Sequence, residues 1–431
     1  MAALSLEQAP PIWAPVRFFL TAPLFGAAAG ALLALRADAV TASRWTPDSL
    51  AVVHLLVLGF MLQVMAGALL QFLPVAAGAS VWRPTWVAGI VHPGLAVGAV
   101  LLVAGFLGAG PLAMQAAAVL LGSILAGYVV VIGLALARSP AIGPTLLSLR
   151  VAIAALAITA GLGVTLAGAF GWGWGLPLLE LTAVHAAWGL LGWGVVLVSG
   201  VAGLVVPMFQ LTPAYPVAFA RAVPRVLAGA LLAWSAGIAF AIPPLAWAGA
   251  IGAAGAVVAF AGVTLRLQAR RKRKLVDTTF HSWRVGMGCL LLAAPLGLWL
   301  LAGPPDALRP KLEYLLGVLL LAGAFPAVIG GMLYKIVPFL CWLHLQRVMR
   351  GAPHMGQVLA EKWARRQSWL FVAALVFLLA GAAWTPLVAV GGWLFCASCL
   401  ALELNLIAAM RFYLKKVAAA PGIPEPERCL T

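Results

Sequence analysis

Two histidines lie inside long apolar stretches of this sequence, each a short distance after an acidic residue. His54 lies six residues after Asp48, and His185 lies five residues after Glu180. On helices, both rings then lie about 8–9 Å inside the start of their segments. An ionisable side chain inside a bilayer costs about 2.5–3.5 kcal/mol, so a residue kept there is a candidate for function. Neutral imidazole is the commonest protein ligand of metal ions and an axial ligand of haem iron.

The pattern therefore predicts that His54 and His185 are ligands of a metal ion or of haem iron. The alternative is that each ring is only hydrogen-bonded to a backbone carbonyl or a carboxylate. No equivalent histidine stands in the third segment of this kind, where Val318 and other apolar residues lie.

His92 and Glu403 are two further ionisable residues in apolar stretches. We expect a structural role for His92, because no partner histidine shares its depth. Glu403 is either a proton-relay carboxylate or a neutral acid hydrogen-bonded within the bundle, and we favour the second. The remaining three histidines are expected in solvated cytoplasmic loops: His281, His344 and His354.

Two sets of sulfur-containing residues also have the spacing of a helix face. Met61 and Met65 continue the face of His54, and thioethers suit copper(I), although such a stripe is more often core packing. Cys396 and Cys399 form a C-x-x-C one helical turn apart. We interpret that pair as packing, because no other ligand type lies near it in sequence.

The elements that must position these residues are membrane helices. The chain has 431 residues, of which 64% are apolar and 9% charged, whereas about a quarter of an ordinary soluble domain is charged. Stretches of about 20 apolar residues can cross a bilayer. The sequence therefore predicts an all-α membrane protein, one polytopic domain with twelve transmembrane helices, near 16–36, 48–74, 85–109, 112–137, 150–170, 178–207, 223–243, 245–267, 284–302, 312–340, 368–384 and 387–411.

The formal charge of +16 does not indicate nucleic-acid binding, because the basic residues lie at one end of the predicted helices. Only four of the 27 lysines and arginines fall at the other end: Arg36, Arg44, Arg309 and Lys311. Basic residues stay on the cytoplasmic side of a membrane. We predict that both termini are cytoplasmic and that the bilayer, not nucleic acid, is the partner of this surface.

Three of the predicted helices end alike, which indicates an internal repeat. They read "VMAGALLQFLPV", "LVSGVAGLVVPM" and "AVIGGMLYKIVPF", and their prolines, Pro74, Pro207 and Pro338, are 133 and 131 residues apart. We predict three four-helix units, at about 12–143, 144–277 and 278–416, with a short cytoplasmic tail at 417–431. Each proline is expected to end its helix at the cytoplasmic interface, and Lys335 to reach that interface from the third helix.

Several of these segments resemble a known family. "FPAVIGGMLYKIVP" and the stretch at 54–78 resemble the second helix of heme-copper oxidase large subunits, which begins with a haem-ligating histidine. "RFFLTAPLFGAA" and "VVPMF" are more similar to NnrS-type proteins, membrane relatives that hold haem and copper. The resemblance implies a subunit-I-like fold in the inner membrane of a bacterial cell. It also implies His54 as haem ligand and His185 at the helix where oxidases carry a copper ligand.

The sequence departs from the oxidase pattern where the other ligands belong. The seventh predicted helix has no His-His pair, and the tenth has neither of the family's histidines. We therefore expect a haem- or copper-binding protein that is not a proton-pumping terminal oxidase. Its expected role is in nitric oxide or nitrosative-stress chemistry, or in respiratory metal and haem handling. Whether it is an enzyme stays open.

Two other functions fit the residues. One is a secondary transporter of a small solute, with Glu403 and His185 as coupling groups, although transporters usually place the site near the midplane between discontinuous helices. The other is a partner of respiratory-chain or assembly proteins without a cofactor, in which the 341–367 segment lies along the membrane surface as an amphipathic helix.

Overall fold

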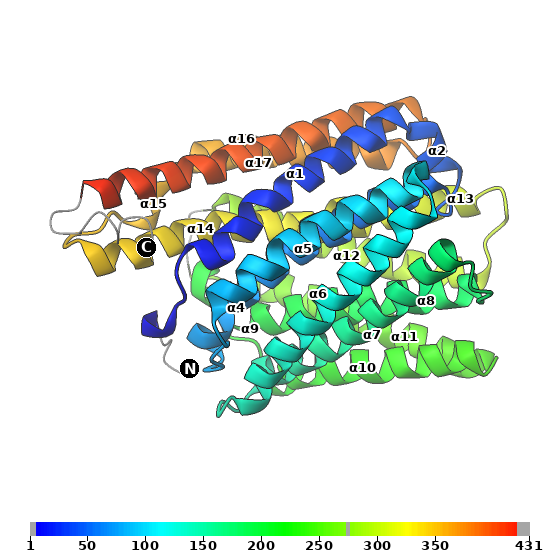
Figure 1. The fold of residues 1–431 in the computed structure, drawn as a ribbon, viewed down its shortest axis with the longest axis horizontal. Helices are drawn as coiled ribbons and strands as arrows, with labels where there is room; N and C mark the ends of the chain where they lie inside the picture. Colours follow the sequence, from blue (N-terminus) through cyan, green and yellow to red (C-terminus); the bar gives the residue numbers. More distant parts are fainter. Residues whose placement is uncertain (1–5, 273–275, 420–431) are drawn as a thin grey trace.

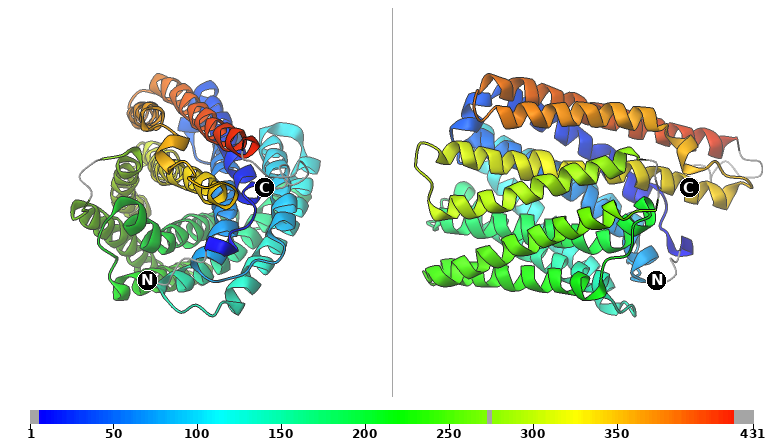
Figure 2. Two further views of the ribbon diagram at one scale, coloured as in Figure 1. Left: turned by 90° about the vertical axis from the view of Figure 1, so that its left-hand side faces the viewer. Right: turned by 180° about the vertical axis from the view of Figure 1, so that it is seen from behind.

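A computed structural model describes residues 6–272 and 276–419, and these residues are helical throughout, without a strand. Of the predicted tail at 417–431, residues 420–431 lie outside the described residues. The helices are arranged side by side in one bundle (Figures 1 and 2). They are η1 Leu6–Gln8, α1 Trp13–Leu35, α2 Ala37–Ala42, α3 Pro47–His54, η2 Leu55–Leu62, α4 Gln63–Ala76, α5 Pro84–Ala104, η3 Gly105–Ala109, α6 Pro111–Arg138, α7 Pro144–Trp172, α8 Leu178–Ala187, η4 Trp188–Val195, α9 Val196–Gln210, α10 Val217–Ala239, α11 Pro243–Ala269, α12 Thr278–Ala302, α13 Arg309–Gly317, η5 Val318–Ala324, α14 Phe325–Val348, α15 Met355–Val358, α16 Glu361–Ala380 and α17 Pro386–Ala418.

Within the described ranges, eleven helices are long and apolar enough to cross a membrane, which makes the chain an all-α, multi-pass membrane protein. Eleven of the twelve predicted segments correspond to them. The twelfth, at 368–384, falls in α16. That helix has 20 residues, but its first two turns carry four charged side chains, Glu361, Lys362, Arg365 and Arg366.

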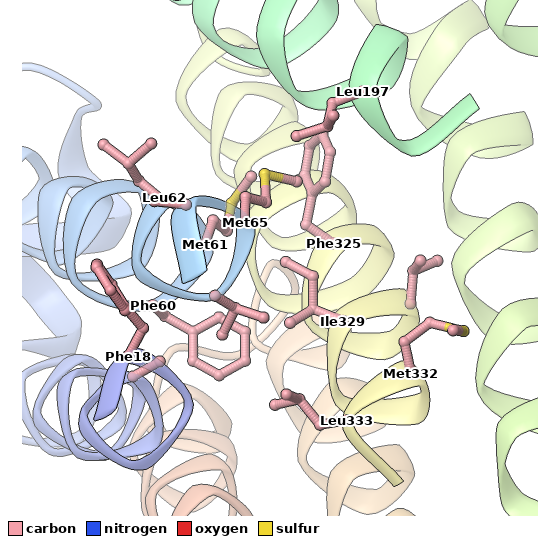
Figure 3. Packing of buried hydrophobic residues seen from close by; sticks show 14 of the residues in the cluster. Phe18, Phe60, Met61, Leu62, Met65, Leu197, Phe325, Ile329, Met332 and Leu333 are labelled. Carbon is pink, nitrogen blue, oxygen red and sulfur yellow. The ribbon is translucent and has the colours of Figure 1, made fainter. Parts of the chain in front are cut away.

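Three of the spans are built in the same unusual way, with a π-helical segment between two α-helical parts. They are α3–η2–α4, α8–η4–α9 and α13–η5–α14. Their buried shares are 72%, 56% and 78%, whereas each of the other spans except α1 has at most 44%. We call these three the inner helices; together with α1, at 61%, they are the most buried spans of the bundle. Figure 3 shows Met65, Leu197 and Ile329, one from each, in the packed interior.

The inner helices are fixed at the end where α3 and α13 begin. Thr46 accepts a hydrogen bond from the Ser49 backbone N–H at 3.2 Å and caps α3, which satisfies one of the free donors of a helix start. Asp48 pairs with Arg36 at 2.8 Å. Arg44, in the segment between α2 and α3, pairs with Glu313 of α13 at 3.4 Å. This ion pair therefore connects the segment before the first inner helix to the start of the third inner helix.

The prediction that prolines end the inner helices is wrong for Pro338 and correct to within two or three residues for Pro74 and Pro207. Pro338 lies inside α14, which continues for ten residues to Val348, while Pro74 and Pro207 lie two and three residues before the ends of α4 and α9. A proline removes one backbone donor and kinks a helix, but the helix continues where its neighbours hold it.

Two further expectations fail because α14 is longer than predicted. His344 lies on α14, buried at 6% exposure, and is not a solvated loop residue. His354 is exposed outside a helix as predicted, whereas His281 is exposed but lies in α12 and not in a loop. The predicted surface helix at 341–367 is instead the end of α14, the short α15 and the start of α16. Lys335 Nζ pairs with Asp277 Oδ2 at 2.9 Å, at the residue that caps the start of α12; its reach to the membrane interface stays a prediction.

Candidate functional site

His54 is the last residue of α3, and its ring is held by its own helix. Its Nδ1 lies 2.7 Å from the carbonyl oxygen of Leu50, one turn earlier. A carbonyl oxygen only accepts hydrogen bonds, so Nδ1 carries the proton and Nε2 keeps its lone pair. The ring also lies against Phe106 of η3, with centroids 5.1 Å apart.

His185, in α8, is held in the same way by a neighbouring helix. Its Nδ1 lies 3.1 Å from the carbonyl oxygen of Thr159 in α7. Nδ1 is therefore again the protonated nitrogen and Nε2 the free one. Among the described residues, neither His54 Nε2 nor His185 Nε2 has a hydrogen-bond partner.

One face of α7 forms a wall behind both rings. Thr159 and Gly163 contact His185 from this face; a Cβ at Gly163 would lie 3.1 Å from His185 Cε1. Phe170 follows seven residues later, on the same side of the helix, and its ring packs on Phe106 at 6.1 Å. Phe106 in turn covers the ring of His54.

The two rings also have matching places in their helices. Each histidine lies seven residues after the first residue of its helix, α3 or α8, which is about 10 Å of rise. A π-helical segment begins directly after His54 and three residues after His185. Such segments often occur at functional sites, because the extra residue in the turn redirects side chains.

This arrangement satisfies both interpretations of the histidines. A hydrogen bond from Nδ1 to a backbone carbonyl is the bond of a structural histidine, and it is also the bond that orients a metal-ligating one. It leaves two imidazole nitrogens available. No group of three or more His, Cys, Asp and Glu side chains lies close enough to hold a metal in the part of the chain that the structure describes. The site therefore offers two imidazoles and no third ligand of these types.

The other predicted candidates lie elsewhere. His92 Nε2 is 2.7 Å from the hydroxyl of Thr21 and links α5 to α1, as a structural role requires. Glu403 Oε2 is buried and has no hydrogen-bond partner among the described residues, so the favoured expectation of a hydrogen-bonded acid is wrong.

The sulfur side chains are part of the core. Met61 and Met65 are buried at 3% and 6% exposure, and Figure 3 shows them among apolar side chains. Cys396 and Cys399 are free thiols. A Cβ at Gly26 of α1 would lie 2.8 Å from Cys399 Sγ, so the C-x-x-C lies where α1 and α17 approach each other.

The partners of the histidines could not be found from the sequence. Phe106, Thr159 and Phe170 lie 26 to 116 residues away from the histidine that they hold or help to cover, and no motif marks them. The π-helical segments have a weak signal, because each contains glycine within an apolar run, as in "WGLLGWG" at 188–194.

No protein-family model matches this chain, and no curated protein matches it.

Proposed function

We propose that the protein binds haem or copper through His54 and His185. The observation that carries this proposal is the shared state of the two rings: each is fixed through Nδ1 on a backbone carbonyl, and each leaves Nε2 without a hydrogen-bond partner among the described residues. Imidazoles prepared in this way are typical of metal ligands, whose second nitrogen is bonded to a carbonyl or carboxylate.

The residues present fit two kinds of centre. Two imidazole nitrogens could hold a haem iron or a copper(I) ion. Either group, when bound, would supply one-electron chemistry. The protein's own part is to fix both ring orientations through Leu50 and Thr159 and to cover one side of His54 with Phe106.

We further propose that the scaffold is three four-helix units, with α16 as the twelfth crossing, as in heme-copper oxidase large subunits. The three π-helical segments begin at Leu55, Trp188 and Val318, with spacings of 133 and 130 residues, close to the spacings of the prolines. The missing oxidase ligands favour a role in nitric oxide or nitrosative-stress chemistry, or in respiratory metal or haem handling. The site of action would be a bacterial inner membrane, with respiratory or assembly proteins as partners.

The visible spectrum and the metal content of the purified protein test this function. We expect either a Soret band or copper close to one per chain. His54→Ala and His185→Ala should each remove most of the bound group, because each removes one of two ligands. His281→Ala is the matched control, since that histidine is exposed and lies outside the site; it should leave the spectrum and the metal content unchanged.

A folded protein without a Soret band and without stoichiometric metal would contradict the proposal. Loss of the group in His281→Ala as severe as in His54→Ala would contradict the assignment of the ligands. Crosslinking to respiratory subunits in the absence of any cofactor would instead favour an assembly partner.

One observation favours transport as a second candidate function. Glu403 keeps a buried oxygen without a hydrogen-bond partner, and an unpaired acid in a membrane protein is a candidate proton carrier. Accumulation of a labelled solute in proteoliposomes, abolished by Glu403→Gln and retained in His54→Ala, would establish this function.

A further inference from the structure

Two sulfur atoms meet where α14 and α17 pack against each other. The Sγ of Cys341, on α14, lies 4.0 Å from the Sδ of Met410, on α17. Cys341 is fully buried, and Met410 is 3% exposed. A metal–sulfur bond is about 2.3 Å long, so two sulfurs at this separation can bind the same ion with an angle of about 120° at the metal.

An imidazole without a partner follows on the same helix. His344, three residues after Cys341 on α14, is 6% exposed, and its Nε2 is buried without a hydrogen-bond partner among the described residues. Residues three apart on a helix are neighbours, with about 5–6 Å between their Cβ atoms. Native proteins rarely bury a polar nitrogen in this way unless water or a ligand satisfies it. His344 is therefore the third potential ligand beside the two sulfurs.

The repeat does not account for these residues. The inner helices α4 and α9 end two and three residues after their prolines, whereas α14 continues for ten residues beyond Pro338 to Val348. Cys341 and His344 both lie in this extension. The geometry that the three inner helices share therefore requires neither the thiol nor the imidazole.

The ligand set favours copper(I) over other common metal ions. Thiolate and thioether are soft ligands that suit copper(I), whereas a structural zinc site takes four ligands from cysteine, histidine and carboxylates. The described residues contain no group of three or more His, Cys, Asp and Glu side chains that could hold a metal, so the third ligand available is the thioether of Met410. One thiolate also balances the charge of a monovalent ion, whereas a divalent ion would keep an uncompensated positive charge in a buried place.

We propose that Cys341, His344 and Met410 bind one copper(I) ion at the junction of α14 and α17. The thiol of Cys341 releases its proton to solvent as the sulfur binds the ion, and no electron is transferred. This ion is additional to the haem or copper expected at His54 and His185, and the proposal does not depend on that site.

Anaerobic titration of the purified, metal-free full chain with copper(I), in competition with a coloured copper(I) chelator, tests this site. The double variant His54→Ala/His185→Ala removes the other candidate site, and we expect it still to bind one copper(I) per chain. In that variant, Cys341→Ala and Met410→Leu should each weaken binding by at least about tenfold, because each removes one of three ligands. Zinc(II) at the same concentration should not displace the ion.

Two other buried sulfur side chains provide matched controls. Cys289→Ala and Met332→Leu make the same changes outside the site, at 6% and 7% exposure, and should leave the affinity unchanged. His344→Leu removes the imidazole and should weaken binding as the sulfur variants do. The same titration of Cys341→Ala in the otherwise wild-type chain should show the loss of one copper equivalent, and this result does not depend on the folding of the double variant.

No loss of copper(I) in Cys341→Ala, in either background, would overturn the proposal. So would an unchanged affinity of Met410→Leu or His344→Leu, because the assigned residue would then not be a ligand. X-ray absorption of the bound copper should show sulfur at about 2.3 Å, and a spectrum with nitrogen and oxygen ligands alone would contradict the site. Copper binding that is lost in Cys341→Ala and retained in His54→Ala/His185→Ala would support this site even if the histidine site binds nothing.

Discussion

Two residues of α7 confine the ring of His185. The carbonyl oxygen of Thr159 accepts a hydrogen bond from its Nδ1, and Gly163 lies against its Cε1. The glycine leaves room for the ring, because a methyl group there would lie 3.1 Å from Cε1, closer than ordinary van der Waals contact. The orientation of His185 therefore depends on two residues of another helix, neither of which can bind a metal through its side chain in this position.

We predict that Gly163→Ala weakens binding of the metal or haem by about tenfold, because it displaces a ligand without removing it. Titration of the apo-protein with copper(I) or haemin measures the effect. Gly161→Ala is the matched control. Gly161 lies two residues before Gly163 on α7 and has open space where a Cβ would be, so the same change there should be neutral or slightly stabilising. Equal affinities of the two variants would mean that α7 does not position the ligand.

At the level of single residues, the sequence was a good guide to depth and a poor guide to partners. It predicted that His54 and His185 lie at matching positions, and they do, because helical rise converts spacing into depth. The sequence placed His344 in a loop, because the prediction ended the helix near Pro338, whereas α14 continues past this proline to Val348. It also gave Glu403 a hydrogen bond that the described residues do not provide.

At the scale of helices, the first and last spans pack together through glycines. A Cβ at Gly30 of α1 would lie 2.6 Å from the backbone nitrogen of Cys396, and a Cβ at Gly392 of α17 would lie 2.7 Å from the carbonyl oxygen of Gly30. Backbones approach this closely only where small residues face each other. In Figure 1, α1 and α17 lie side by side along the upper edge of the bundle.

We predict that Gly30→Ala destabilises the protein by about 1–3 kcal/mol, because the methyl group meets backbone atoms that cannot move independently. The thermal unfolding temperature in detergent measures this change. Gly288→Ala on α12, where the space around the glycine is open, should leave that temperature unchanged or raise it. A Gly30→Ala variant as stable as Gly288→Ala would show that α1 and α17 can separate freely.

The helices themselves were predictable, and their internal geometry was not. Long apolar runs indicated eleven spans that the structure contains, because crossing a bilayer requires such runs. The π-helical segments were missed. The segment η2, for example, has the same apolar composition as its flanks, and the spacing of apolar residues does not predict that Gly59 packs against Phe25 of α1. The contact of Cys341 with Met410 was missed for the same reason, since it forms only where two distant segments meet.

For the whole molecule, the position of α16 decides the topology. In Figure 1, α1 begins and α17 ends at the same end of the bundle, and a chain that returns to its starting side crosses a membrane an even number of times. Eleven helices meet the composition of a span, so α16 supplies the missing crossing if it traverses the bilayer. Its 20 residues give about 30 Å, the thickness of the hydrocarbon core. Its charged first turns can reach the headgroups on the basic side.

We predict that single cysteines at the two ends of α16 are labelled from opposite sides of the membrane. Ala383→Cys, after the helix, should react in intact cells with a thiol reagent that does not cross the membrane. Lys362→Cys, in the first turn, should react only after the cells are made permeable, because basic residues stay in the cytoplasm. Both variants also carry Cys396→Ser and Cys429→Ser, since the other three cysteines are buried. Labelling of both positions from one side would show that α16 lies within or along the membrane, and the proposed third four-helix unit would then lack a crossing.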